Sequence, residues 1–120
     1  MAQTDYVGNT NGVILATGSL GVAEAAVTIL DLRGAGGVSV QITGTFTATV
    51  TFEVSNDGTN WVAVELTTPA GAAAATTATA PGIFVGPLCY QMFRARCSAY
   101  TSGTAVVTIQ TVPGIYAPLP

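Results

Sequence analysis

Apolar and polar residues alternate strictly along the middle of the chain, between residues 38 and 55. A period of two predicts β-strands with one face on a core and the other toward solvent or a partner. The polar positions are mostly threonine, which is β-branched and favours strands. Gly44 interrupts the alternation and predicts a bend or turn. The apolar positions, expected in the core, are Val38, Val40, Ile42, Phe46, Ala48, Val50, Phe52 and Val54.

A tight turn is predicted directly after this segment, at residues 55–60. Asp57-Gly58 between two alternating segments is a strong hairpin signal, and the return strand is expected over residues 61–66. We expect Asp57 to cap the turn and Gly58 to adopt a positive φ. Trp61 is expected to pack over the hairpin.

Further strands are predicted from Ala26 onward, over residues 83–86, over 92–99 and over 104–112. In the strand over 92–99, the residues expected to face the core are Phe93, Ala95, Cys97 and Ala99. Residues 67–80 are rich in alanine and threonine and predict a surface loop, with a short edge strand as an option. Seven to eight short strands separated by turns predict an all-β fold, an antiparallel β-sandwich or jelly roll.

The chain divides into one domain with two arms. Residues 24–112 are expected to form the sandwich, residues 1–23 an N-terminal arm or lead-in, and residues 113–120 a proline-rich C-terminal arm. Both arms keep apolar residues that a solvated tail would not favour, so we expect them to contact neighbouring subunits or a partner. The candidate contact residues are Thr4, Asp5, Tyr6, Val7, Ile115, Tyr116 and Leu119.

Charge is scarce in this chain. Only 8% of the residues are charged, against roughly 25% in a typical domain, so the surface is made of small polar residues or is covered in an assembly. There is no lysine, and the cations are Arg33, Arg94 and Arg96. This argues against binding to nucleic acid or to an anionic membrane. The N-terminus has no signal-peptide pattern, so we expect synthesis in the cytoplasm.

Arg94 and Arg96 share one face of a predicted strand. They could contact an acidic patch on a neighbouring subunit, or they could pair with Glu53 or Glu65 across the sheet. The sequence leaves both interpretations open.

Catalytic and metal-binding residue patterns are missing from the sequence. The chain has no histidine, which excludes Ser/His/Asp and Cys/His sites within one chain, and no zinc or EF-hand spacing occurs. We therefore expect no enzymatic activity, no metal and no cofactor. A carboxylate pair of Glu53 and Glu65 is formally possible, but two solvated strand residues are the simpler interpretation.

The two cysteines are eight positions apart, around one predicted strand. Eight extended residues span roughly 26 Å, whereas a disulfide needs Cα atoms about 5.5 Å apart. We therefore expect Cys89 and Cys97 to be reduced, and both to be mostly buried.

Two segments resemble sequences of known proteins. The hairpin Ser55-x-Asp57-Gly58-x-x-Trp61 resembles one found in many phage structural β-sandwiches, and also the equivalent hairpin of discoidin-type carbohydrate- and lipid-binding domains. It resembles the sialidase Asp-box too, but is one residue shorter between Asp57 and Trp61. The segment over 93–105, which reads Phe-Arg-Ala-Arg and then Tyr-Thr-Ser-Gly-Thr-Ala, is similar to a strand and turn of the same phage sandwiches.

The resemblance implies a capsid decoration (cement) protein of a tailed phage. Such a protein is made in the host cytoplasm and binds the outer surface of the capsid, commonly as a homotrimer, with the major capsid protein as its partner. The alternatives are a glycan-binding module of a tail or head fibre, and a tail or adaptor protein. A glycan site needs exposed aromatic residues, and the candidates, which are scattered along the sequence, are Trp61, Tyr90, Tyr100 and Tyr116.

Overall fold

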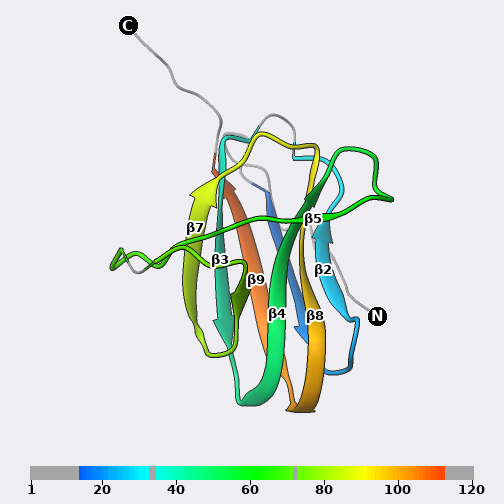
Figure 1. Ribbon diagram of the computed structural model, residues 1–120, viewed down its shortest axis with the longest axis vertical. Coiled ribbons are helices and arrows are strands. Elements are labelled where there is room, and N and C mark those ends of the chain that lie inside the picture. The colour runs from blue at the N-terminus through cyan, green and yellow to red at the C-terminus, as the bar shows by residue number, and fades with distance from the viewer. Residues whose placement is uncertain (1–13, 33–34, 72, 113–120) are drawn as a thin grey trace, which may run out of the picture.

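The computed structural model describes residues 14–32, 35–71 and 73–112. Within these residues the fold is all-β, with two antiparallel sheets packed face to face (Figure 1). The described residues form nine strands: β1 (Leu15–Leu20), β2 (Ala26–Ile29), β3 (Gly37–Thr43), β4 (Phe46–Ser55), β5 (Val62–Ala63), β6 (Thr77–Ala78), β7 (Gly82–Pro87), β8 (Met92–Gly103) and β9 (Ala105–Val112).

The strand order is that of a jelly roll. Sheet A has the order β1-β9-β3-β7, and sheet B has the order β2-β8-β4-β5, with β6 also paired to β4. The first half of the chain pairs with the second half in reverse: β1 with β9, β2 with β8, β3 with β7, and β4 with β5 and β6. The chain is thus a long hairpin rolled up so that most successive strands alternate between sheets. The predicted all-β sandwich is confirmed.

The core lies between the sheets and follows the predicted alternation. Val38, Val40 and Ile42 of β3 are buried, and so are the inward residues of β4 from Val50 onward. Phe52 and Phe84 bring their ring centroids to 5.5 Å across the core, from sheet B and sheet A respectively. Among the described residues, no helix is long and apolar enough to cross a membrane.

Two glycines allow the chain to pass from one sheet to the other. Gly44 joins β3 of sheet A to β4 of sheet B, and Gly103 ends β8 of sheet B just before β9 of sheet A. Both have positive φ, 104° and 83°. The corners lie side by side, because Thr104 N donates to Thr45 O at 3.1 Å. Gly44 therefore occupies the bend that its break in the alternation predicted.

The start of the sandwich was predicted wrongly. Residues 15–20 were expected in the N-terminal lead-in, but they form β1 and pair with β9 along the whole strand. The inward positions of β1 are Ala16, Gly18 and Leu20, of which Ala16 and Leu20 have no exposed surface. Alanine and glycine carry little hydrophobic contrast, so the alternation of this strand is invisible in the sequence.

The long strand β8 also differs from its prediction. It continues to Gly103, whereas the strand was expected to end near Ala99. Ala99 is exposed, not directed into the core as predicted, because β8 contains a bulge. Cys97 is opposite Val50 while Ala99 is opposite Thr49, so Ser98 is an extra residue that turns Ala99 outward. A second shift leaves Thr101 as another extra residue, so the facing is reversed only between the two.

The segment between β5 and β7 is close to its prediction. The return strand β5 is shorter than expected, and residues 67–71 and 73–80 are irregular apart from the short strand β6 near their end. Thr67 and Val85 exchange backbone hydrogen bonds of 2.8 and 2.7 Å, which caps part of the outer edge of β7. The predicted arm residues 1–13 and 113–120 lie outside the described residues.

Candidate functional site

The outer faces of the two sheets differ in charge. None of the charged residues in the described part of the chain belongs to a strand of sheet A. All of them lie in sheet B or in loops: Glu24, Asp31, Glu53, Asp57, Glu65, Arg94 and Arg96. Sheet A therefore presents an uncharged outer surface four strands wide.

The outer surface of sheet A consists of rows of uncharged side chains, in which polar and aliphatic residues are mixed. The strand register places Thr17, Thr108, Gln41 and Ile83 in one row across the sheet. Its neighbour is the row of Leu15, Gln110, Ser39 and Val85. Covering hydroxyl and amide groups costs far less than covering charges, since each can find a hydrogen-bond partner across an interface. This surface, the sheet A face, can be covered by another protein at low cost.

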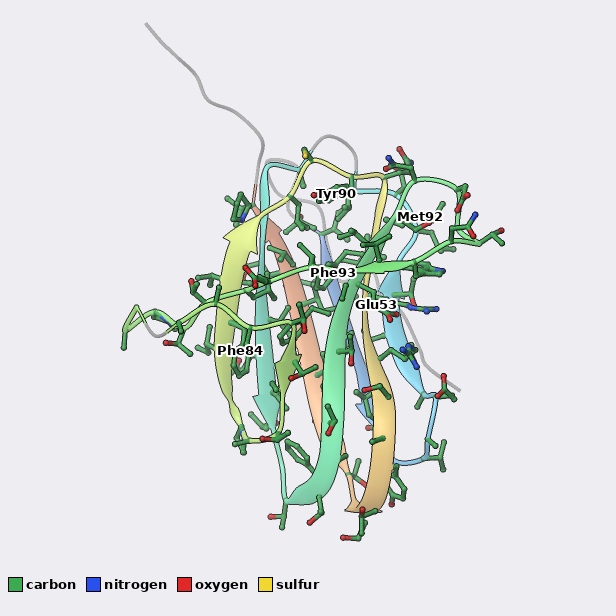
Figure 2. All side chains as sticks on the ribbon, in the orientation of Figure 1. Glu53, Phe84, Tyr90, Met92 and Phe93 are labelled. Carbon is green, nitrogen blue, oxygen red and sulfur yellow. The ribbon has the colours of Figure 1, made fainter. Side chains whose placement is uncertain are left out.

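Sheet B instead carries an ion-pair cluster centred on Glu53 (Figure 2). Arg94 Nε donates to Glu53 Oε1 at 2.7 Å, and Arg96 donates to both carboxylate oxygens, at 3.1 and 2.9 Å. Arg96 Nη1 also donates to Glu24 Oε1 at 2.9 Å. The strand register explains this geometry, because Arg94 is directly opposite Glu53 on the neighbouring strand.

Electrostatics holds the Glu53 cluster in its charged form. Burial raises the pKa of the Glu53 carboxyl. Hydrogen bonds and charge from Arg96 and Arg94 lower it by more than burial raises it, so the pKa lies below its ordinary value. The Arg94 guanidinium also lies over the Trp61 ring, 4.1 Å from the ring centroid. Both arginines are thus paired within the chain, which favours the cross-sheet interpretation over an acidic partner patch.

The predicted turn between β4 and β5 is present and closely bonded. Gly58 has a φ of 77°. Ser55 Oγ accepts hydrogen bonds from the backbone N–H of Asp57 and of Gly58, at 3.2 and 2.9 Å. Trp61 Nε1 donates to Gly58 O at 3.3 Å, so the indole lies back over the turn as expected. A Cβ added to Gly58 would lie 3.3 Å from Met92 Sδ, at the start of β8.

The carboxylate of Asp57 accepts hydrogen bonds from within the turn. Its oxygens accept four hydrogen bonds, from Ser55 Oγ, Thr59 N, Asn60 N and Asn60 Nδ2. These bonds lower the pKa of Asp57 far below its ordinary value, and those from Asn60 lower it most. The role of Asp57 in the turn is therefore to cap it.

An open pocket of about 350 Å³ lies beside this turn, lined by residues 54–57, 60, 62–64 and Tyr90. Tyr90 comes from the loop that leads into β8. The strand register explains why Tyr90 lies beside the turn, because Ser55 at the end of β4 is opposite Met92 at the start of β8. The sequence named Tyr90 as one of four scattered aromatics but did not indicate the pocket, or the part of Asn56 and Asn60 in it.

The two cysteines differ in burial. Cys97 is buried and its Sγ donates to Ala99 O at 3.4 Å. Cys89 is exposed, so the prediction that both cysteines are buried is wrong for this one; the loop after β7 buries its neighbour Leu88 instead. Both thiols are free.

Glu65 is exposed and Glu53 is bound to arginines, which disfavours a catalytic carboxylate pair.

Metal-ligand clusters of three or more side chains are absent from the described residues. The candidate arm contacts cannot be placed in the fold, since they fall outside the described residues: Thr4, Asp5, Tyr6, Val7, Ile115, Tyr116 and Leu119.

Comparison with known proteins identifies a similar fold. No family model matches the chain, and no curated protein matches it. The crystal structure of YomS, a protein derived from the SPBc2 prophage, superposes with a TM-score of 0.64. The sequences are 11% identical, and the alignment covers 82% of this chain and 95% of YomS. At this identity the likeness shows that the two proteins share the jelly-roll architecture.

Proposed function

We propose that this chain is a structural protein of a tailed-phage virion that binds the outer surface of the capsid as a homotrimer and stabilises the shell. The observation that carries the proposal is the sheet A face, which has no charged residue in its strands. The similar fold of YomS, a prophage-derived protein, supports a phage origin for this chain. The resemblance of the 55–61 hairpin and the 93–105 segment to phage sandwiches points the same way.

The sheet A face suits a protein interface for a physical reason. A charged residue at the centre of an interface loses water and needs an ideally placed partner, so interface cores are depleted of charge. Threonine, serine and glutamine lose less on desolvation, and valine and isoleucine gain from burial. Val106, Ile83 and Val112 of sheet A are each between 38 and 45% exposed, and a partner would cover them.

Repeated weak contacts would supply the stabilisation of the shell. A trimer that touches several capsid subunits at once gains avidity without any single strong contact. In the proposal, residues 2–10 and 113–120 add contacts beyond the sandwich, and prolines lower the entropy that the C-terminal segment loses on docking. The proposal includes no catalytic activity, no nucleic acid and no membrane, and it places the mature protein on the virion surface.

A charge placed on the sheet A face tests the proposal. Gln110 is exposed on β9, in the middle of sheet A, and a lysine there would have to be buried in any interface. We expect Gln110→Lys to fold normally but to be monomeric by light scattering and to be lost from capsids of the parent phage. The matched control is Thr47→Lys, on the outer face of β4 in sheet B, which should still assemble.

Copy number distinguishes the proposed role from its alternatives. Quantitative mass spectrometry of purified particles should find many copies per head. A few copies per particle would indicate a fibre, tail or adaptor protein and would contradict the decoration role. Assembly of Gln110→Lys as tight as that of the wild type would show that the sheet A face is not the interface.

A further inference from the structure

We propose that the pocket beside the β4–β5 turn binds a neutral saccharide, with the Tyr90 ring as the platform for one sugar ring. Its volume, about 350 Å³, lies within the range of small-molecule sites. The pocket is at the end of the sandwich where β4 ends and β8 begins, where Tyr90 and Met92 lie (Figure 2). The inference does not depend on the proposed capsid role.

The apolar part of the pocket matches the face of a sugar ring. Val54 lines it from the end of β4, Val62 from β5 and Val64 from just after β5, and Val62 is 65% exposed. Tyr90 lines it from the β7–β8 loop and is 37% exposed. A pyranose has an apolar face of C–H groups that packs against an aromatic ring, and aliphatic side chains can cover its edge.

The polar groups of the pocket are held in place but not used up. Asn60 Nδ2 donates to Asp57 Oδ2 at 2.8 Å, and Asn56 Oδ1 accepts from Gln91 N at 2.9 Å. Among the described residues, Asn60 Oδ1, Asn56 Nδ2 and the Tyr90 hydroxyl have no protein partner. One acceptor, one donor and one hydroxyl are thus available to sugar hydroxyls, on side chains that need little ordering on binding.

Charge selects a neutral ligand. Asp57 is the charged residue among those that line the pocket, and its carboxylate already accepts four hydrogen bonds. Its negative charge disfavours sialic and uronic acids, and the four donors that already bond its oxygens weaken it as a cation site. Neutral hexoses and N-acetylhexosamines, alone or in oligosaccharides, remain as the ligand class.

The other described aromatic candidates are unsuited to stacking on a sugar. The Arg94 guanidinium lies over one face of the Trp61 ring, and Trp61 is not among the residues that line the pocket. Tyr100 lies far along β8 from the pocket, and its hydroxyl donates to Gly103 O at 2.9 Å. Tyr90 is therefore the residue whose removal should weaken binding most, and Tyr100 provides a matched control.

The test is an NMR titration of the ¹⁵N-labelled full chain with a panel of neutral sugars at millimolar concentration. The panel contains glucose, galactose, mannose, N-acetylglucosamine and their common oligosaccharides, with sialic acid as the anionic comparison. At least one neutral sugar should shift the amides of Tyr90 and the side-chain amides of Asn56 and Asn60. Tyr90→Ala should weaken binding by about tenfold or more, and Tyr100→Ala should leave the dissociation constant unchanged.

Three results would overturn the inference: no shifts with any neutral sugar, shifts confined to residues outside the pocket, or equal binding by Tyr90→Ala. Binding of sialic acid alone would also contradict it, because it would reverse the predicted charge preference. Failure here is distinguishable from failure of the capsid role, since Gln110→Lys disturbs the sheet A face and should bind sugar as the wild type does.

Discussion

Arg96 donates hydrogen bonds to both carboxylate oxygens of Glu53, from Nε at 3.1 Å and from Nη2 at 2.9 Å. This two-point contact joins the central strands β8 and β4 on the outer face of sheet B. The Glu53 side chain is only 9% exposed, so water cannot replace the contact if one partner is removed. The pair is therefore more important for stability than an ordinary surface ion pair.

Replacing Glu53 with glutamine should lower the free energy of unfolding by about 1–3 kcal/mol, because Arg94 would lose the carboxylate it pairs with and Arg96 would keep only the exposed Glu24. Urea unfolding followed by circular dichroism at neutral pH measures the change. The control is Glu65→Gln, an exposed carboxylate, which should change stability by less than about 0.5 kcal/mol. Equal stabilities of the two variants would show that the cluster contributes nothing to the fold.

The same pair predicts how stability depends on acid. The folded pKa of Glu53 lies below its ordinary value of 4.5, so the unfolded chain binds more protons than the folded chain in that window. The contribution of Glu53 is complete above about pH 5 and is lost as the pH falls through the folded pKa. Wild-type protein should thus lose more stability than Glu53→Gln between neutral pH and about pH 3, in paired urea titrations.

Gly58 should matter more to the fold than its exposed position suggests. Gly58 and Gly71 have nearly the same φ, 77° and 82°, but an added Cβ meets Met92 at Gly58 and open space at Gly71. Gly71→Ala should cost about 1 kcal/mol through backbone strain alone, and Gly58→Ala should cost more. Gly58→Val should cost about 1–3 kcal/mol because a β-branched residue is strained at positive φ. Thermal unfolding of the three variants gives the comparison.

A Gly58 variant that keeps wild-type stability but loses its binding partner would show that the turn is a binding site and not a structural turn.

Gly103 should tolerate no side chain. A Cβ at this position would overlap Thr45 O and Phe46 Cα, which belong to the neighbouring sheet-to-sheet corner. Backbone atoms cannot move aside as a flexible side chain can, and the φ of 83° adds strain. Gly103→Ala should destabilise the protein by about 3 kcal/mol or more, visible as a large fall in melting temperature. A variant with an unchanged melting temperature would contradict the packed arrangement of the two corners.

One of the two thiols should react in the native protein. Cys89 is exposed, whereas Cys97 is buried in the core, where burial raises the pKa of its thiol. Because the thiolate is the reactive form, Cys97 is protected both by access and by pKa. Ellman's reagent should modify one cysteine per native chain and two in denaturant, and Cys89→Ser should abolish the native reaction. Native modification at Cys97, identified by mass spectrometry, would be inconsistent with this core.

Deletion of residues 113–120 separates folding from assembly. The described sandwich ends with β9, whose buried residues extend to Thr111. The truncated chain should therefore fold with a melting temperature close to that of the full chain, measured on the monomer. Trimer formation and retention on capsids should weaken, because the proposed arm contacts are gone. Unfolding of the truncated chain would mean that the tail belongs to the core, and unimpaired assembly would exclude an arm contact.

Alternation of residue types was enough to predict the facing of β3, most of β4, and β9, because successive side chains on a strand point to opposite sides whatever the strand pairs with. The Asp57-Gly58 turn was equally predictable, since its hydrogen bonds join residues within three positions of each other. The lack of histidine limits the possible chemistry whatever fold the chain adopts.

Tertiary pairing decided the rest. The small residues Ala16 and Gly18 show no strand pattern, and only their pairing with β9 makes β1 a strand. Both arginines face Glu53 and not Glu65 because of the β4–β8 register, and the bulge at Ser98 turns Ala99 outward. The same register places Tyr90 beside the pocket residues of the β4–β5 hairpin. Successive strands mostly alternate between the two sheets, and this places the strands without charged residues together in sheet A. These relations join residues far apart in the chain, and local propensity cannot encode which strand becomes a neighbour.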